Sequence, residues 1–175
     1  VGQDEVAQLS IFTVGTQKRN RTLQTPPDVN VHEWRSVAFS SDGKLVVALG
    51  DAPDYYLLYW QWERNRTVGS ARVGMPSMRV SLSKREAEGA TVAVSGPKLM
   101  RFYRAVDGQI KGANASVGKR ELLDYSDHCW LSEERLVACA LSGEVSIFEA
   151  QELKQVLPSV HAGSAGLHAI CAFAQ

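Results

Sequence analysis

Residues 36–67 read SVAFSSDGKLVVALGDAPDYYLLYWQWERNRT, and this stretch decides the fold class. It contains a short apolar run, a Ser-Ser-Asp-Gly turn, a second apolar run over Leu45–Leu49 and an aromatic-rich run over Tyr55–Trp62. Gly43 in the turn can take the positive φ that a hairpin needs. Short β-branched and aromatic runs separated by turn residues are typical of strands, and the stretch shows no helical period. It therefore predicts an antiparallel β unit.

This β unit recurs along the chain with a period of about 40 to 50 residues. One marker is an apolar triplet in each first strand: 37–39, 80–82, 129–131 and 171–173. The other is an aromatic residue that ends each third strand: Phe12, Trp60, Phe102 and Phe148. We predict that these four aromatic residues hold equivalent positions and pack between sheets. The turn sequence Arg-Asn-Arg-Thr also recurs, at 19–22 and 64–67, and predicts a repeated hairpin.

A period of this length with about four strands per unit indicates the blades of a β-propeller. Each blade buries its two faces only against neighbouring blades, so the units must stack. We expect an all-β, WD40-type β-propeller, present as a fragment of about four blades of a larger propeller. The expected blades are 29–74, 75–118 and 119–160, with the late strands of another blade in 1–28 and the first strand of the next in 161–175.

Composition narrows the class of protein. The 175 residues include 19 Lys and Arg and 19 Asp and Glu, so the formal net charge is zero. This balance argues against a nucleic-acid partner, because neutralising phosphates needs a basic surplus. No apolar run reaches the roughly 18 residues of a membrane span, and the residues at 1–5 do not resemble a signal peptide. Three cysteines without close pairing indicate buried thiols in a reducing compartment such as the cytoplasm.

Two levels of resemblance follow from these residues. The Ser-Ser-Asp-Gly-Lys-Leu turn and the Trp-ended strand resemble a WD repeat, with Trp60-Gln61 in place of the Trp-Asp pair. More specifically, the chain resembles the first propeller of the WD-repeat cilia- and flagella-associated proteins. The member numbered fifty-seven fits best, and the members numbered forty-three and forty-four are alternatives. The matching stretches are 48–66, 128–130, 135–137 and 143–149.

The resemblance implies a non-catalytic protein-interaction scaffold of the ciliary or flagellar axoneme. Its implied location is the cytoplasm and cytoskeleton, within the cilium or flagellum. It implies support for inner dynein arm assembly or docking and for ciliary motility. The implied partners are dynein-arm subunits, other ciliary scaffold proteins or tubulin, with neither nucleic acid nor membrane. The alternative is a propeller-fold hydrolase whose site lies in blades not included here.

The sequence offers little support for catalysis, and we expect no enzyme, no catalytic or metal site and no cofactor. The four histidines show no ligand spacing with cysteine or carboxylate: His32, His128, His161 and His168. Asp51 and Asp54 lie in one loop beside a proline and are expected to cap a turn rather than to act as paired acids. A Gly-rich phosphate loop and a serine nucleophile elbow are both missing from the sequence.

Two candidate partner-binding surfaces remain. The first is a rim where the first strands begin, close to the loop after the second strand. Its predicted residues are Arg35, Ser36, Tyr55, Tyr56, Met78, Arg79, Asp127 and His128. The second is a basic patch of hairpin residues at the opposite end: Lys18, Arg19, Arg21, Arg64 and Arg66. A local excess of positive charge attracts an acidic partner even when the net charge is zero.

Overall fold

The computed structural model describes residues 7–86, 89–106, 109–159 and 166–172. In these residues the secondary structure is almost entirely β, which confirms the predicted class. No helix in the described part is long and apolar enough to cross a membrane. The strands are β1 (Leu9–Thr13), β2 (Lys18–Leu23), β3 (Trp34–Phe39), β4 (Leu45–Gly50), β5 (Tyr56–Gln61), β6 (Arg66–Arg72), β7 (Arg79–Leu82), β8 (Val92–Gly96), β9 (Leu99–Val106), β10 (Gln109–Asn114), β11 (Tyr125–Trp130), β12 (Arg135–Ala140), β13 (Val145–Glu149) and β14 (Glu152–Leu157), with a 3-10 helix η1 (Trp62–Arg64) between β5 and β6.

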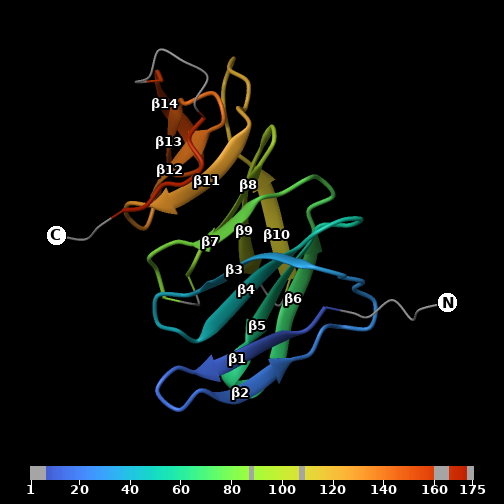
Figure 1. Ribbon diagram of the computed structural model, residues 1–175. Helices are drawn as coiled ribbons and strands as arrows, with labels where there is room; N and C mark the ends of the chain where they lie inside the picture. The colour runs from blue at the N-terminus through green and yellow to red at the C-terminus, as the bar shows by residue number, and fades with distance from the viewer. Residues whose placement is uncertain (1–6, 87–88, 107–108, 160–165, 173–175) are drawn as a thin grey trace.

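The strands form three four-stranded antiparallel sheets, each with its strands in chain order: β3–β6, β7–β10 and β11–β14. β1 and β2 form a separate two-stranded sheet. The sheets follow one another from the blue end of the chain to the red end (Figure 1). Each sheet lies within one of the residue ranges that the sequence predicts for the blades.

Burial of both sheet faces explains the continuous apolar run in β4, whose six residues are all buried. One face of β3–β6 packs against the β1–β2 sheet and contributes Trp60. The other face contributes Tyr59 and packs against β7–β10, which contributes Tyr103. The far face of β7–β10 contributes Phe102 to the core shared with β11–β14. The sheets therefore stabilise one another through three successive apolar interfaces.

The register of the sheets corrects one of the repeat markers. Tyr103, not Phe102, is the counterpart of Trp60, so the prediction for Phe102 is wrong by one residue. A slip of one residue moves a side chain to the other face of a sheet. The first-strand triplet of the last sheet slips likewise and is 128–130 rather than 129–131. The equivalent cross-strand rows are Phe39–Val46–Trp60, Leu82–Val92–Tyr103 and Trp130–Leu136–Phe148.

Phe12 holds the expected position but not the expected surroundings. A β-bulge precedes Phe12 in β1, as bulges precede Trp60 in β5 and Phe148 in β13. Phe12 is nevertheless 58% exposed, whereas Trp60 is fully buried. Its side chain is on the face of the β1–β2 sheet that no described sheet covers. The prediction that all four aromatic residues pack between sheets is therefore wrong for Phe12.

The repeated Arg-Asn-Arg-Thr sequence does not form a repeated turn. Asn65 has a left-handed backbone with φ of 48° and ends η1 in the β5–β6 turn. Asn20 instead lies inside β2, and Gln17, with φ of 54°, takes the left-handed position of that hairpin. The motif lies later in the first hairpin than in the second, so the prediction of an equivalent turn is wrong.

The described residues 166–172 form no strand, although the sequence predicts one in 161–175. They lie beside β11, where the backbone N–H of Ile170 donates to Asp127 Oδ2 at 3.0 Å. The N–H of Val80 in β7 donates in the same way to Ser36 Oγ of β3, at 3.1 Å. Residues 166–172 thus contact β11 as the first strand of a following blade would, but they form no strand. Residues 160–165, with His161, and 173–175, with Phe173, lie outside the described residues.

Candidate interaction surfaces

The rim predicted from the sequence lies at the end of the sheets where the first strands begin. Arg35 and Ser36 occupy the start of β3, and Arg79 is the first residue of β7. The β4–β5 loop reaches the same end, because β5 begins there with Tyr56. β3 contacts β7, and β7 contacts β11, so residues of three sheets meet along one edge.

Ion pairs neutralise the arginines of this rim. Arg35 Nε donates to Asp51 Oδ2 at 3.1 Å, and this hydrogen bond lowers the pKa of Asp51 and raises the pKa of Arg35. Arg79 Nε lies 3.1 Å from Asp127 Oδ1 and so links two neighbouring sheets. Asp51 also caps its turn as expected, since its Oδ1 accepts the N–H of Ala52 at 2.8 Å. The sequence did not predict these ion pairs.

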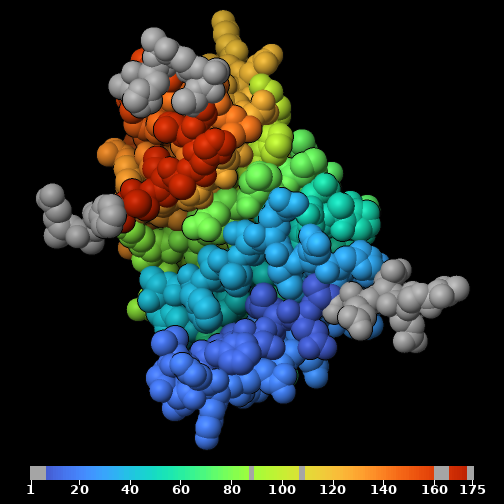
Figure 2. All heavy atoms as spheres, viewed as in Figure 1, coloured from blue at the N-terminus to red at the C-terminus, as the bar shows by residue number. Residues whose placement is uncertain are grey.

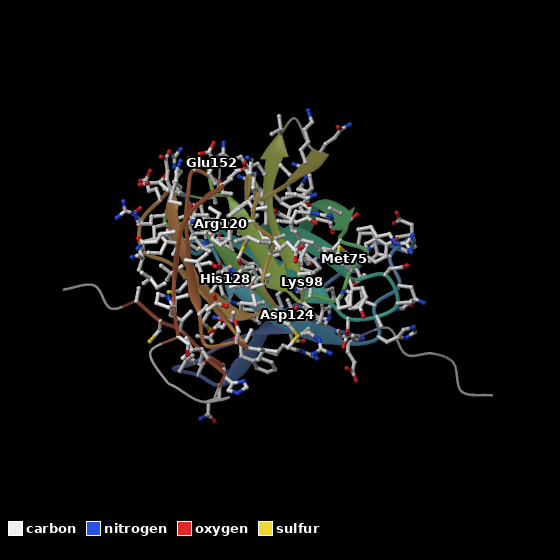
Figure 3. The ribbon with its side chains drawn as sticks, turned by 90° about the horizontal axis from the view of Figure 1, so that it is seen from above. Met75, Lys98, Arg120, Asp124, His128 and Glu152 are labelled. Carbon is white, nitrogen blue, oxygen red and sulfur yellow. The ribbon has the colours of Figure 1, made fainter. Side chains whose placement is uncertain are left out.

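His128 is not a rim residue, which corrects its predicted role. It is 1% exposed and lies between two sheets, where Ser81 Oγ is 2.6 Å from Nε2 and Ser95 Oγ is 2.6 Å from Nδ1. Burial, together with the charge of Arg79, lowers the pKa of His128 to about 3, so the ring is neutral at pH 7. Figure 3 labels His128 on the β11 side of the molecule and Lys98 in the turn between β8 and β9 of the neighbouring sheet. His128 therefore joins two sheets and is closed to a partner.

The remaining rim residues divide by exposure. Tyr55 and Tyr56 are half-buried and pack against two different apolar cores, so little of either ring faces solvent. Ser36 is half-buried and uses its hydroxyl to accept the N–H of Val80. Met78 is 42% exposed and is the apolar rim side chain most available to a partner. A partner at this rim would contact Met78 and the paired arginines.

The second surface consists of Lys18, Arg19, Arg21, Arg64 and Arg66, and we name it the basic edge. β2 supplies the first three residues, and the η1 turn and the start of β6 supply the other two. β2 contacts η1, so the two groups lie side by side. In the described part of the chain, none of the five forms an ion pair.

Three further cations belong to the first-to-second-strand turns of the neighbouring sheets, Lys44, Lys84 and Arg85, and two of them are neutralised. Lys44 pairs with Asp42 at 3.5 Å. Arg85 pairs with Glu133 and Glu134 of the β11–β12 turn, both at 3.0 Å. Lys84 forms no ion pair in the described residues, and its Nζ donates to Leu131 O at 3.0 Å. The unpaired positive charge at this end therefore comprises the basic edge and Lys84.

No set of three His, Cys, Asp or Glu side chains within the described residues could hold a metal ion. The cysteines are free: Cys139 is buried, Cys129 is half-buried and Cys171 is exposed. The prediction of buried thiols is therefore wrong for Cys171, which lies in a segment that forms no strand. Burial raises the pKa of the Cys129 thiol, which makes it less reactive.

Comparison with known proteins tests the resemblance. No protein-family model matches the chain. Mouse cilia- and flagella-associated protein 57 is 28% identical over 135 residues, which cover 75% of this chain and 10% of that protein. The chain is similar to cilia- and flagella-associated protein 57. Protein 57 C of Tetrahymena thermophila is 27% identical over 115 residues, which cover 61% of this chain and 9% of that protein. The resemblance inferred from the sequence is therefore confirmed, and the chain spans about a tenth of these relatives.

A solved structure confirms the fold class. The β-propeller domain of Cps50 (Swd1) from Myceliophteria thermophila superimposes with a TM-score of 0.71. The match covers 87% of this chain and 50% of that domain, at 13% sequence identity. The stacked sheets are therefore propeller blades, as predicted, and this similarity bears on the fold alone.

Proposed function

We propose that this protein is a non-catalytic protein-interaction scaffold of the ciliary or flagellar axoneme. The observation that carries the proposal is the similarity to cilia- and flagella-associated protein 57 over 75% of the chain. The propeller fold supports it, because stacked blades present rim loops on a rigid framework and binding residues gather on such loops.

The finer proposal is that the scaffold supports the assembly or docking of inner dynein arms and so contributes to motility. Dynein-arm subunits, other ciliary scaffold proteins or tubulin would then be its partners. The rim is the proposed contact surface for a dynein-arm subunit. Met78 is exposed there and directly precedes the ion-paired Arg79, and protein interfaces combine apolar side chains with polar surroundings in this way.

Affinity capture from axonemal extract tests this function. The immobilised protein is incubated with salt-extracted axonemal proteins, and the retained proteins are quantified by mass spectrometry. The rim variant Met78→Asp is compared with Leu157→Asp, which alters a similarly exposed side chain, 38% against 42%, on the outer strand β14. We expect enrichment of dynein-arm subunits by the parent protein and a loss of about tenfold for Met78→Asp alone, since 1.4 kcal/mol of lost contact energy gives this factor.

Two results would contradict the proposal. Retention of no axonemal protein would remove the scaffold function. Equal retention by Met78→Asp and Leu157→Asp would remove the rim as the contact surface. Melting curves of both variants show whether each is folded, so a loss of capture by a folded variant reports the contact itself.

A further inference from the structure

We propose that the basic edge binds an acidic segment of a protein partner. The inference rests on the proposed scaffold function and names a second contact surface for it, at the opposite end of the sheets from the rim. In Figure 2 the β1–β2 hairpin forms one end of the molecular surface, where a partner can reach it. The residues of this surface are Lys18, Arg19, Arg21, Arg64 and Arg66.

Strand pairing places these cations close together. Lys18 pairs with Thr13 and Arg19 with Phe12 near the end of the β1–β2 hairpin. Arg66 starts β6 directly after the η1 turn, which contains Arg64 and contacts β2. Both hairpins therefore present their cations at the same end of adjacent sheets. Except for the half-buried Arg21, these side chains are exposed.

Local charge is strongly unbalanced here, although the chain as a whole is neutral. The β1–β2 hairpin, residues 9–23, contains three cations and no acidic residue. The β5–β6 turn contains one acidic residue, Glu63, and two cations, Arg64 and Arg66. Elsewhere in the described residues, seven cations pair with acids: Arg35, Lys44, Arg72, Arg79, Arg85, Arg135 and Lys154. Others, including Lys84, Lys111, Lys119 and Arg120, form no ion pair there, but they lie outside these two hairpins. The basic edge therefore keeps its charge available to an external partner.

Unpartnered polar atoms gather at the same place. Arg21 Nε, Gln61 Oε1 and Asn65 Oδ1 are buried without a hydrogen-bond partner in the described residues. Gln61 also lines a surface hollow together with Lys44, Glu63 and Arg64. Buried polar groups in proteins are normally hydrogen-bonded, so a cluster of exceptions requires an explanation. Each of these atoms is itself closed to solvent, so a ligand that brings both acceptors and donors would satisfy them after their side chains turn outward.

The mixture of groups favours an acidic peptide over a nucleic acid. Peptide carboxylates would accept hydrogen bonds from arginine and lysine, and backbone N–H groups would donate to the amide oxygens of Gln61 and Asn65. The phosphates of a nucleic acid only accept hydrogen bonds, so they would leave these amide oxygens without a donor. An acidic peptide thus fits both the charge of the surface and its unpaired acceptors.

Fluorescence anisotropy with a labelled oligoglutamate peptide of about ten residues tests the proposal. Because exposed charges are screened beyond about 8 Å at physiological ionic strength, we expect the affinity to fall at least tenfold as salt rises from low to well above that level. An oligoglutamine peptide of the same length measures binding that does not depend on charge. A single-stranded oligonucleotide of equal charge measures binding by charge alone.

Matched charge reversals localise the binding. The test variant carries Arg19→Glu, Arg64→Glu and Arg66→Glu. The control carries Lys111→Glu, Lys119→Glu and Arg120→Glu, which reverse three exposed cations outside the basic edge. We expect the test variant to lose at least tenfold in oligoglutamate affinity and the control to lose less than threefold, with the melting curves of both showing that each is folded.

Several results would overturn the inference. These are equal losses in the two folded variants, a flat salt response, equal binding of oligoglutamine, or tighter binding of the oligonucleotide than of the peptide. None of them bears on capture of dynein-arm subunits at the rim, which the Met78→Asp comparison measures separately. Failure of the basic edge and failure of the scaffold function are therefore distinguishable.

Discussion

Replacing Trp60 by alanine should strongly destabilise the stack of sheets. Trp60 is fully buried, packs edge-on against Trp34 with ring centroids 5.6 Å apart, and donates from Nε1 to Gln24 O at 2.9 Å. Loss of its apolar area and the cavity left behind cost about 3–5 kcal/mol. Gln24 is exposed, so water can replace the lost hydrogen bond and adds little to this cost. For a chain of this size the melting temperature should fall by about 6–20 °C.

Phe12→Ala is the matched control, because Phe12 follows the same β-bulge in its own sheet but is 58% exposed. We expect it to cost less than about 1 kcal/mol, since most of its ring already contacts water. Urea unfolding followed by far-ultraviolet circular dichroism measures both variants without relying on tryptophan fluorescence. A cost for Trp60→Ala below about 1 kcal/mol, or equal costs for the two variants, would refute burial between blades as the source of stability.

Two further predictions concern the joints between sheets. Burial lowers the pKa of His128 from its ordinary 6.5 to about 3, so the unfolded chain binds more protons in this window and stability falls as the pH falls from 6.5 towards 3. The free energy of unfolding should fall by up to about 1.4 kcal/mol per pH unit in this window, and His128→Gln should abolish that fall. Urea unfolding at a series of pH values measures the parent and the variant, and parallel pH profiles of the two would contradict the buried neutral ring. A Cβ on Gly96 would lie 2.5 Å from Pro76 O, whereas one on Gly15 would meet no atom within 4 Å. Gly96→Ala should therefore cost more than about 2 kcal/mol and Gly15→Ala less than about 0.5 kcal/mol, and equal melting temperatures would show that the β7–β8 edge is not closely packed.

The blade repeat was predictable from the sequence because the third strand of each four-stranded sheet carries a buried aromatic residue in the equivalent cross-strand row. The register of the β7–β10 sheet was not. Phe102 and Tyr103 are each 2% exposed, since neighbouring sheets cover both faces of β9. The alternation of apolar and polar residues along a strand identifies its buried face only when the other face is exposed to solvent. Two adjacent buried aromatic residues therefore gave no signal for choosing between them.

The candidate surfaces were predictable in position but not in chemistry. The sequence placed Arg79 and His128 at one end of the sheets, yet the burial of His128 depends on Ser81 and Ser95, which are 47 and 33 residues away in the chain. The pairing of Arg79 with Asp127 likewise joins two blades. Local sequence patterns do not encode such contacts between blades. The basic edge was found because its charges are local to two hairpins.

Localisation of the protein in detergent-extracted cilia tests the proposed scaffold function most directly. The protein is tagged at its own chromosomal locus, cilia are isolated and demembranated, and fluorescence is measured along the remaining axonemes. The proposal predicts that the tag stays on the axoneme after the membrane and soluble contents are removed. Fluorescence confined to the cell body, or released completely with the detergent-soluble fraction, would contradict an axonemal scaffold.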